Sequence, residues 1–546
     1  MRITRIAAAA GGIAIASALV LSGCASHNGS NNGGGASGGI ITVDNNEPQN
    51  PLIPAITNEV GGGLVLQNIF AGLVYYEADG AVQMESAESI ESENDDNQHW
   101  TIKLKDGLKF SDGSDVTASS FVDAWQYAAS DDAFENHWWF ANFAPAEGAQ
   151  VSDSDGAPVG EDALDVAVVD DSTFTVNLAA PQSDFVVSLG YQVFSPLPQA
   201  FFDDPEAFGE APIGNGPYKL EKWNHDEVIS LVPNENYDGP RKAQNAGIDL
   251  KVYGTLDAAY TDLISDNLDI LKQVPSSQLA SYKDDLGDRA IDQPAAIWQG
   301  LTIPSFLKHF EPGEEGTLRR QAISYAIDRE QITDKIFLGT RTPAVDFTSP
   351  VIDGWSDSIP GSEVTHFDAD KAKELWAQAD AITPWDGTLK LTYNADGDHK
   401  AWTEAVANQL ANTLGIETEA VAYPDFATLR GEIKNRTSEG LLRSGWQFDY
   451  PGAYNILGAL YITGAGSNDG EYSNPEYDEL VNKGATAPSV EEANKYFEQA
   501  QEVLFKDLPV LPLWYSSVNG GYSTLVDNVE FGWDSWPLLY AVTKSA

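Results

Sequence analysis

Cysteine is almost absent from this chain, since Cys24 is the only one in 546 residues. A chain with a single cysteine forms no internal disulfide. Basic residues are also scarce: 31 Lys and Arg stand against 82 Asp and Glu, for a formal net charge of −51. This balance excludes nucleic acid as a partner, because phosphate binding requires the opposite sign of charge.

Motifs of the common catalytic and cofactor sites are also missing. The seven histidines are scattered, with no H-E-x-x-H and no pair at ligand spacing. No G-x-x-x-x-G-K-[ST] occurs, and the glycines at 214–217 lack the third glycine and the helix of a dinucleotide site. We interpret 214–217 as a tight turn before a strand at 218–220. No pair of acids stands out as a glycosidase site. We therefore predict no enzyme, no catalytic residue, no metal and no cofactor.

The N-terminus carries the strongest local motif. Arg2 and Arg5 precede an apolar stretch at 6–21, which ends in Leu21-Ser22-Gly23-Cys24. This stretch is shorter than the roughly 20 residues of a membrane span, and small residues before a cysteine form a lipobox. We predict a lipoprotein signal peptide at 1–23, acylation of Cys24 by palmitate or a similar chain, and a flexible Gly/Ser/Asn tether at 24–39. With no later apolar run long enough to span a bilayer, Cys24 would be the sole anchor, on the outer face of the cell membrane.

The folded part extends from about Ile40 to Ala546, which is long enough for two or three cores. Strand-like segments at 40–43 and 99–104 alternate with helical ones. Thr117, Asp328 and Asp368 stand where N-caps would begin helices. This alternation predicts a mixed α/β body.

Six sequence blocks run in order through the chain: LQNIFAGL at 66–73, LKFSDG at 108–113, IGNGPY at 213–218, RRQAISYAIDR at 319–329, GWQFDYP at 445–451 and LPLWY at 511–515. Together they resemble extracytoplasmic solute-binding protein family 5, the oligopeptide- and dipeptide-binding lipoproteins of ABC importers. The resemblance implies an α/β, two-lobed periplasmic-binding-protein-like fold with an extra inserted domain. Lobe I would comprise 40–73, 193–298 and 514–546, the inserted domain 74–192, and lobe II 299–513. Two hinge crossovers, near Trp298 and Pro512, would let the lobes close over a ligand.

The resemblance also implies the site. Peptide main chain would pair with two segments, Asn58-Glu59-Val60-Gly61 and Ser444-Gly445-Trp446-Gln447. Asp449 would bind the peptide's α-ammonium, and Arg443 would bind its carboxylate end. Trp446 would stack on a ligand side chain or line the pocket that holds it. Structural alternatives stay open: Asp449 as a turn acid, Arg443 as a strand-edge charge and Trp446 as a core residue.

These features predict a monomeric, extracytoplasmic receptor that binds oligopeptides and delivers them to ABC permease subunits. An oligosaccharide-binding member of the same family is the alternative, with Trp and Tyr as stacking platforms, although the charges of Asp449 and Arg443 favour a zwitterion. A surface scaffold or adhesin and an extracytoplasmic hydrolase are alternatives from other classes. Ligand length and sequence, and the identity of the permease, do not follow from the sequence.

Overall fold

The computed structural model describes residues 38–131, 134, 136–152, 156–397 and 399–545. Cys24, the predicted signal peptide at 1–23 and the predicted tether up to residue 37 lie outside these residues. No helix within the described ranges is long and apolar enough to cross a bilayer.

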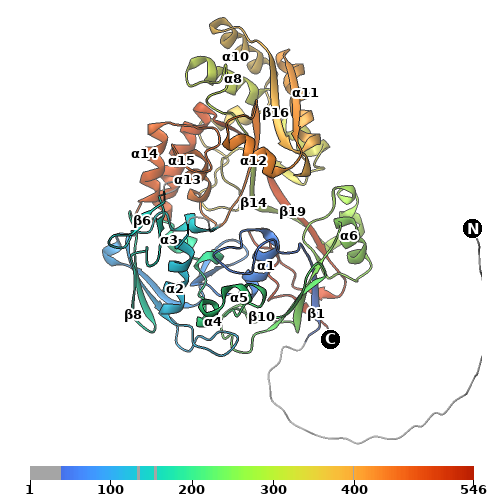
Figure 1. The fold of residues 1–546 in the computed structure, drawn as a ribbon. Helices are drawn as coiled ribbons and strands as arrows, with labels where there is room; N and C mark the ends of the chain where they lie inside the picture. The colour runs from blue at the N-terminus through green and yellow to red at the C-terminus, as the bar shows by residue number, and fades with distance from the viewer. Residues whose placement is uncertain (1–37, 132–133, 135, 153–155, 398, 546) are drawn as a thin grey trace, which may run out of the picture. The chain divides into compact units, whose positions relative to one another are not determined.

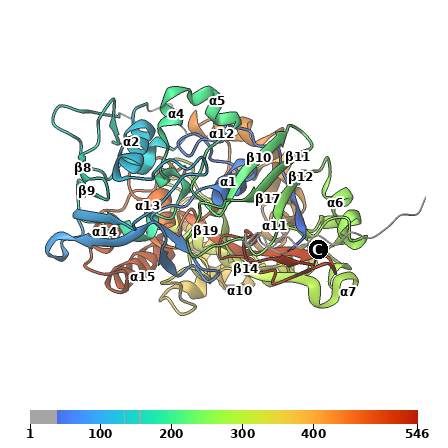
Figure 2. The same cartoon turned by 90° about the horizontal axis from the view of Figure 1, so that it is seen from below.

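One mixed eleven-stranded sheet is the largest sheet of the described chain (Figure 1). Its strand order is β10-β11-β12-β1-β13-β19-β14-β18-β16-β17, with β15 paired to β19. Seen from below, β10, β11 and β12 lie side by side (Figure 2). The bounds are β1 Ile40–Asn45, β10 Tyr218–Asn224, β11 Val228–Pro233, β12 Gly247–Val252, β13 Ile270–Leu271, β14 Ala290–Thr302, β15 Arg341–Pro343, β16 Thr388–Asn394, β17 Glu417–Tyr423, β18 Leu441–Gln447 and β19 Val510–Tyr522.

Two hydrophobic cores share this sheet. The first core draws its residues from Ile41 to Ala295 and from Val518 to Val542. The second core draws its residues from Ala296 to Tyr515, together with Trp533. The boundary therefore falls inside β14 and β19, the two 13-residue strands that join the cores in Figure 1.

The predicted crossovers lie next to each other in the sheet. Trp298 is in β14 and Pro512 is in β19, and the two strands are antiparallel with Gly300 opposite Pro512. Both connections between the cores thus run through one pair of hydrogen-bonded strands. The predicted domain bounds remain predictions, while the pairing supplies a physical reason for placing the crossovers here.

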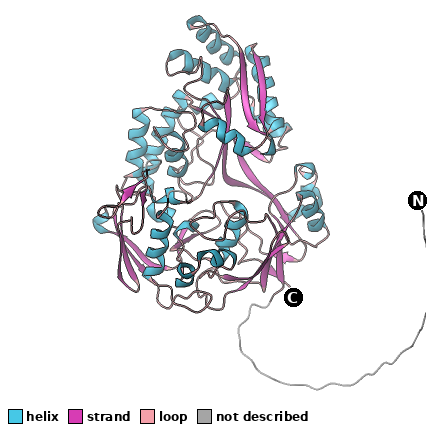
Figure 3. Cartoon of the chain, viewed as in Figure 1, coloured by secondary structure: helices cyan, strands magenta, loops and turns pink. Residues whose placement is uncertain are grey.

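Helices cover the sheet and the cores (Figure 3). Their bounds are α1 Val60–Ile69, α2 Ala118–Ala129, α3 Phe185–Ser188, α4 Gln199–Asp203, α5 Pro205–Glu210, α6 Leu256–Ile264, α7 Tyr282–Leu286, α8 Glu314–Tyr325, α9 Arg329–Lys335, α10 Ala369–Ile382, α11 Lys400–Leu414, α12 Phe426–Lys434, α13 Tyr454–Tyr461, α14 Pro475–Ala485 and α15 Val490–Asp507. All three predicted N-caps are confirmed: Thr117 forms a capping box with Ser120, and Asp328 and Asp368 accept backbone N–H bonds at the starts of α9 and α10.

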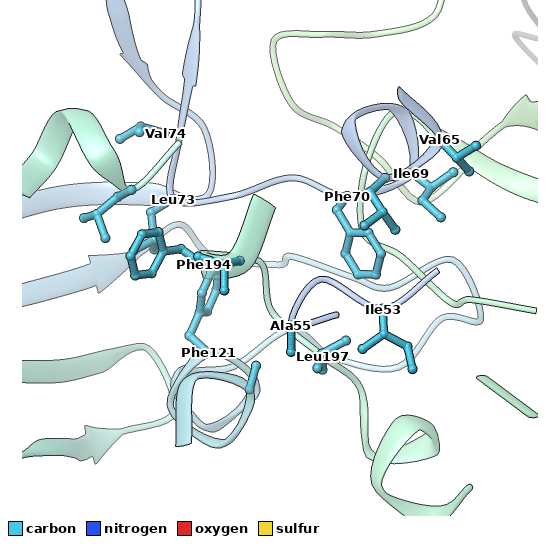
Figure 4. Packing of buried hydrophobic residues seen from close by; sticks show 14 of the residues in the cluster. Ile53, Ala55, Val65, Ile69, Phe70, Leu73, Val74, Phe121, Phe194 and Leu197 are labelled. Carbon is cyan, nitrogen blue, oxygen red and sulfur yellow. The ribbon is translucent and has the colours of Figure 1, made fainter. Parts of the chain in front are cut away.

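A separate four-stranded sheet, β4-β5-β9-β8, packs on the first core. Its strands are β4 Ala87–Ser92, β5 His99–Leu104, β8 Val166–Asp170 and β9 Thr173–Asn177. Phe121 of α2 stacks on Phe174 of β9, with ring centroids 6.0 Å apart. Figure 4 shows another part of this core, where Phe70 points toward Ile53 and Leu197. The strand predicted at 99–104 is confirmed as β5.

The backbone conformation at 214–217 differs from the predicted tight turn. Residues 212–215 have no regular secondary structure, a bend follows at Gly216 and Pro217, and β10 then begins. A Cβ on Gly214 would lie 1.9 Å from the carbonyl oxygen of Ile69, at the end of α1. The glycine is therefore required for a close backbone approach between distant segments, which local turn chemistry does not reveal.

Candidate functional site

A cavity of about 270 Å³ lies between the two cores. Its wall comes from the start of α1, from β2 (Val74–Tyr76), from residues 447–449 at the end of β18, and from the C-terminal loop 532–540. The volume is close to the lower end of small-ligand sites, which start at roughly 300 Å³. Residues 447–449 lie at the end of β18 in the second-core region, and α1 belongs to the first core. Movement of one core against the other would therefore open the cavity.

The structure brings five of the predicted binding residues to this cavity. They are Asn58, Glu59, Val60, Gln447 and Asp449.

Gly61, Arg443, Gly445 and Trp446 are outside the lining. Gly445 lies in β18 opposite Gln299 of β14, and Gly61 lies in the first turn of α1. The four residues therefore do not form part of the cavity wall.

The segment at 58–61 is a helix start and not an extended strand. Val60 and Gly61 are the first residues of α1, and Glu59 is its N-cap. The Glu59 carboxylate accepts N–H bonds from Gly61 at 2.7 Å and from Gly62 at 2.9 Å. A carboxylate here also stabilises the positive end of the helix dipole. Because Val60 and Gly61 are helical, only the residues before Val60 could pair with the main chain of a ligand.

The segment at 444–447 has an open edge. On one side, β18 pairs with β14 from Leu442 to Gln447. On the other side it pairs with β16 only at Leu441 and Leu442, and no further described strand continues that ladder. An unpaired strand edge offers a row of N–H and C=O groups to an incoming extended chain.

Asp449 is held in place through Asn455 of α13. The amide of Asn455 donates to Asp449 Oδ2 at 3.1 Å, and its oxygen accepts from the Asp449 backbone N–H at 3.2 Å. The same oxygen accepts from Trp446 Nε1 at 2.7 Å. Trp446 therefore orients the acid through Asn455. Burial raises the pKa of Asp449 to about 6, because the Asn455 hydrogen bond only partly offsets the loss of water.

Sequence reasoning missed the C-terminal wall of the cavity. Trp533, Asp534 and Trp536 line it, and Trp533 meets Tyr76 edge-to-face at 5.4 Å. Asp534 accepts from the Trp536 backbone N–H at 3.0 Å and from Gln67 Nε2 at 3.3 Å. Burial also raises the pKa of Asp534 to about 6. In the sequence, Asp534 stands between Trp533 and Trp536. This acid flanked by aromatic residues could have indicated a binding site.

A buried ion pair forms the base of the cavity in the first core. Arg241 donates from Nε to Glu85 Oε1 at 2.7 Å and from Nη2 to Oε2 at 2.9 Å. It also donates to the carbonyl oxygens of Gln67 and Phe70 at the end of α1. The two side chains satisfy each other and fix the helix that supplies the cavity wall.

Further polar contacts join the two sides away from the cavity. Tyr450 donates to Asp184 Oδ2 at 2.6 Å, and the Ser183 backbone N–H donates to the Ala485 oxygen at 2.7 Å. Asn97 Nδ2 donates to the Ala487 oxygen at 3.0 Å. These bonds hold residues 450–487 against the four-stranded sheet region, and opening the cavity by moving the cores apart would exchange them for water.

Comparison with known proteins identifies the family. The model of bacterial extracellular solute-binding proteins, family 5 Middle, matches residues 81–468. The chain is 25% identical over 519 residues to the oligopeptide-binding protein OppA of Bacillus subtilis, covering 91% of this chain and 92% of the relative. It is 27% identical over 466 residues to the periplasmic murein peptide-binding protein MppA of Escherichia coli, covering 84% and 83%.

The solved structure of the E. coli murein tripeptide binding protein MppA superposes with a TM-score of 0.75 at 22% identity, covering 93% of this chain and 99% of that one. The fold is thus the α/β, two-lobed one expected from the sequence blocks. The chain belongs to family 5 of the bacterial extracellular solute-binding proteins, which bind substrates for transport and are not enzymes.

Proposed function

We propose that this protein is a lipid-anchored receptor that captures oligopeptides in the cavity between its cores and delivers them to an ABC permease. The observation that carries the proposal is Asp449, a desolvated carboxylate in the cavity wall that follows directly on the open edge of β18. The peptide-binding relatives and the family's role in transport support the same assignment.

Asp449 has the chemistry of an amine anchor. In the empty protein, its only hydrogen-bonded side-chain partner among the described residues is the neutral amide of Asn455. A peptide α-ammonium would supply the missing counter-charge and up to three donors. Charge-assisted bonds of this kind contribute roughly 1.5 to 3 kcal/mol each.

The open edge of β18 would hold the peptide's main chain. Residues 444–447 offer backbone groups on the side that β16 leaves uncovered. Pairing with main chain recognises a peptide without reading its side chains, so affinity for many sequences follows.

Arg443 would meet the carboxylate end of longer peptides. It lies on the same face of β18 as Gly445 and Gln447, because side chains alternate along a strand. A Cβ on Gly445 would be 3.9 Å from Arg443 Nη2, so the guanidinium extends along the strand, and it lies 5.6 Å from the centre of the Phe426 ring. Arg443 and Gln447 are four steps apart along β18, or roughly 13 Å, so the two ends of the strand would contact different parts of an extended ligand.

Membrane attachment would come from Cys24. The lipobox at 21–24 and the tether at 24–39 support it. Acylation by more than one chain gives a stable anchor, and a flexible tether lets the receptor reach its permease.

A neutral sugar fits the cavity less well. It would leave Asp449 and Asp534 buried without a counter-charge, which costs free energy. The aromatic rings alone would serve a sugar, but the two acids favour a cationic group.

Peptide affinity is expected to fall on acidification. Because burial raises the pKa of Asp449 to about 6, the carboxylate is charged at pH 7.5 and largely protonated at pH 5. An ammonium loses its partner over this window, so we expect affinity roughly tenfold weaker per pH unit below 6. For the empty protein the sign is opposite: a raised carboxyl pKa contributes stability at low pH that is lost as the pH rises through 6. Calorimetric titrations from pH 5 to 8 measure the slope, and an affinity that is flat across this range would contradict the assignment.

Native mass spectrometry of the chain beginning at Ala25 tests the function itself. The protein is isolated without added ligand, denatured, and the released small molecules are identified. We expect a distribution of short peptides. Released glycans, or an empty protein that binds sugars and not peptides, would favour the oligosaccharide alternative.

A further inference from the structure

The lining of the cavity is strongly acidic. Six charged side chains contribute to it, five acids and one base: Glu59, Glu77, Glu85, Asp449, Asp534 and Arg241. One peptide α-ammonium carries too little positive charge to neutralise five acids. The partners that each acid already has within the protein therefore matter.

Three of the five acids are committed to the protein itself. Glu59 caps α1 through the N–H groups of Gly61 and Gly62. Glu85 is ion-paired with Arg241. Glu77 accepts the hydroxyl of Tyr75 at 3.0 Å. Among the described residues, Glu85 is thus the one acid of the lining that forms an ion pair.

Asp449 and Asp534 share a neighbour, Tyr76. Their hydrogen-bond donors are neutral: the Asn455 amide for Asp449, and the Gln67 amide and Trp536 backbone N–H for Asp534. In the described chain, neither acid forms an ion pair with Lys, Arg or His. Burial raises the pKa of both to about 6. Both residues are half-buried, so a ligand in the cavity can reach them.

The two acids face a common region of the cavity. Both Asp449 and Asp534 help to raise the pKa of the buried Tyr76 phenol, although burial itself is the main cause. Gln447, two residues before Asp449, reaches the backbone oxygen of Asp534 at 3.5 Å. Both carboxylates therefore lie near the same tyrosine, where one end of a ligand would reach them.

Aromatic rings complete the surroundings. Tyr76, Tyr191, Trp533 and Trp536 all line the cavity. The faces of such rings attract ammonium and guanidinium groups, and most strongly where water is excluded. The carboxylates and the aromatic rings are two independent features of the cavity. Both favour an organic cation as the ligand.

We infer that Asp534 is a specificity-determining residue that makes the cavity prefer ligands with two positive charges at one end, such as a peptide whose first residue is Lys or Arg. This inference rests on the proposed function, with Asp449 taking the α-ammonium. Asp534 takes the second cation, supplied by the first side chain. A peptide with a neutral first side chain leaves Asp534 buried and uncompensated, and binds more weakly.

Two tripeptides that differ in one ammonium group test this inference. Lys-Ala-Ala and norleucine-Ala-Ala have first side chains of similar length, but only Lys is charged. Calorimetry at pH 7.5 uses the full chain in detergent micelles, freed of co-purified ligand by unfolding and refolding. We expect the wild type to bind Lys-Ala-Ala at least tenfold more tightly than norleucine-Ala-Ala.

Asp534→Asn keeps an oxygen that can accept the Trp536 N–H and removes the charge. In this variant we expect the ratio of the two affinities to fall to about two or less, with affinity for norleucine-Ala-Ala retained. Asp449→Asn is the matched variant, and it should weaken both peptides.

The outcomes separate the two hypotheses. Equal binding of both peptides by the wild type, or an unchanged ratio in Asp534→Asn, would overturn the role of Asp534 and leave the receptor function intact. Binding of neither peptide by the wild type would overturn the proposed function and this inference together.

Discussion

Replacing Asp449 with Asn is expected to lower peptide affinity by at least tenfold while the fold survives. The substitution keeps the size of the side chain and leaves an oxygen that can accept the Asn455 amide. What it removes is the charge opposite the ligand's ammonium. A lost charge-assisted hydrogen bond costs roughly 1.5 to 3 kcal/mol, which corresponds to a factor of about 10 to 150 in affinity. Isothermal calorimetry with tripeptides measures it.

Asp346 supplies the matched control. It is also a buried acid whose pKa is raised to about 6, but its partners are Thr348, Ser356 and Gln501 in the second-core region, and it is outside the cavity lining. Asp346→Asn should change the thermal midpoint and leave affinity unchanged. If Asp449→Asn binds as the wild type does, Asp449 is not the amine anchor.

Arg241→Ala is expected to lower the free energy of unfolding by roughly 3 to 5 kcal/mol. The side chains of Arg241 and Glu85 are only 10% and 2% exposed, so the substitution leaves a buried carboxylate whose remaining side-chain donor is the Tyr237 hydroxyl. It also frees the Gln67 and Phe70 carbonyls at the end of α1. Urea unfolding followed by far-ultraviolet circular dichroism gives the value.

The neighbouring Lys242 provides the comparison. Its ion pair with Asp238 is on the surface, with side chains 58% and 91% exposed, and such pairs contribute roughly 0 to 1 kcal/mol. A loss of less than about 1 kcal/mol in Arg241→Ala, equal to that of Lys242→Ala, would show that the buried pair does not stabilise the first core.

The sequence predicted well those structural features that depend on residues close in the chain, such as N-caps and strands. Thr117, Asp328 and Asp368 begin helices because an oxygen at the N-cap meets an N–H two or three residues later. The strand at 99–104 alternates between buried and more exposed residues. Asp449 was placed by resemblance, and the structure puts it in a cavity wall, where its role as an anchor stays a prediction.

The remainder of the site depends on contacts between distant segments. Asp534 receives a hydrogen bond from Gln67, which is 467 positions away. Gly214 is required by the end of α1 and not by its own turn. Trp446 was expected to contact the ligand, yet its indole N–H is directed to Asn455. No periodicity or spacing within a short window carries this information.

The order in which the chain emerges during synthesis matters for the first core. β1 near its beginning pairs with β13, which in turn pairs with β19, so this part of the sheet needs residues up to Tyr522. Asn245 donates to the carbonyl oxygens of Leu539 and Val542. The N-terminal half therefore cannot complete its core until almost the last residue has left the ribosome. A topology dominated by such non-local pairings folds slowly, so the first core stays incomplete for most of the time that synthesis takes.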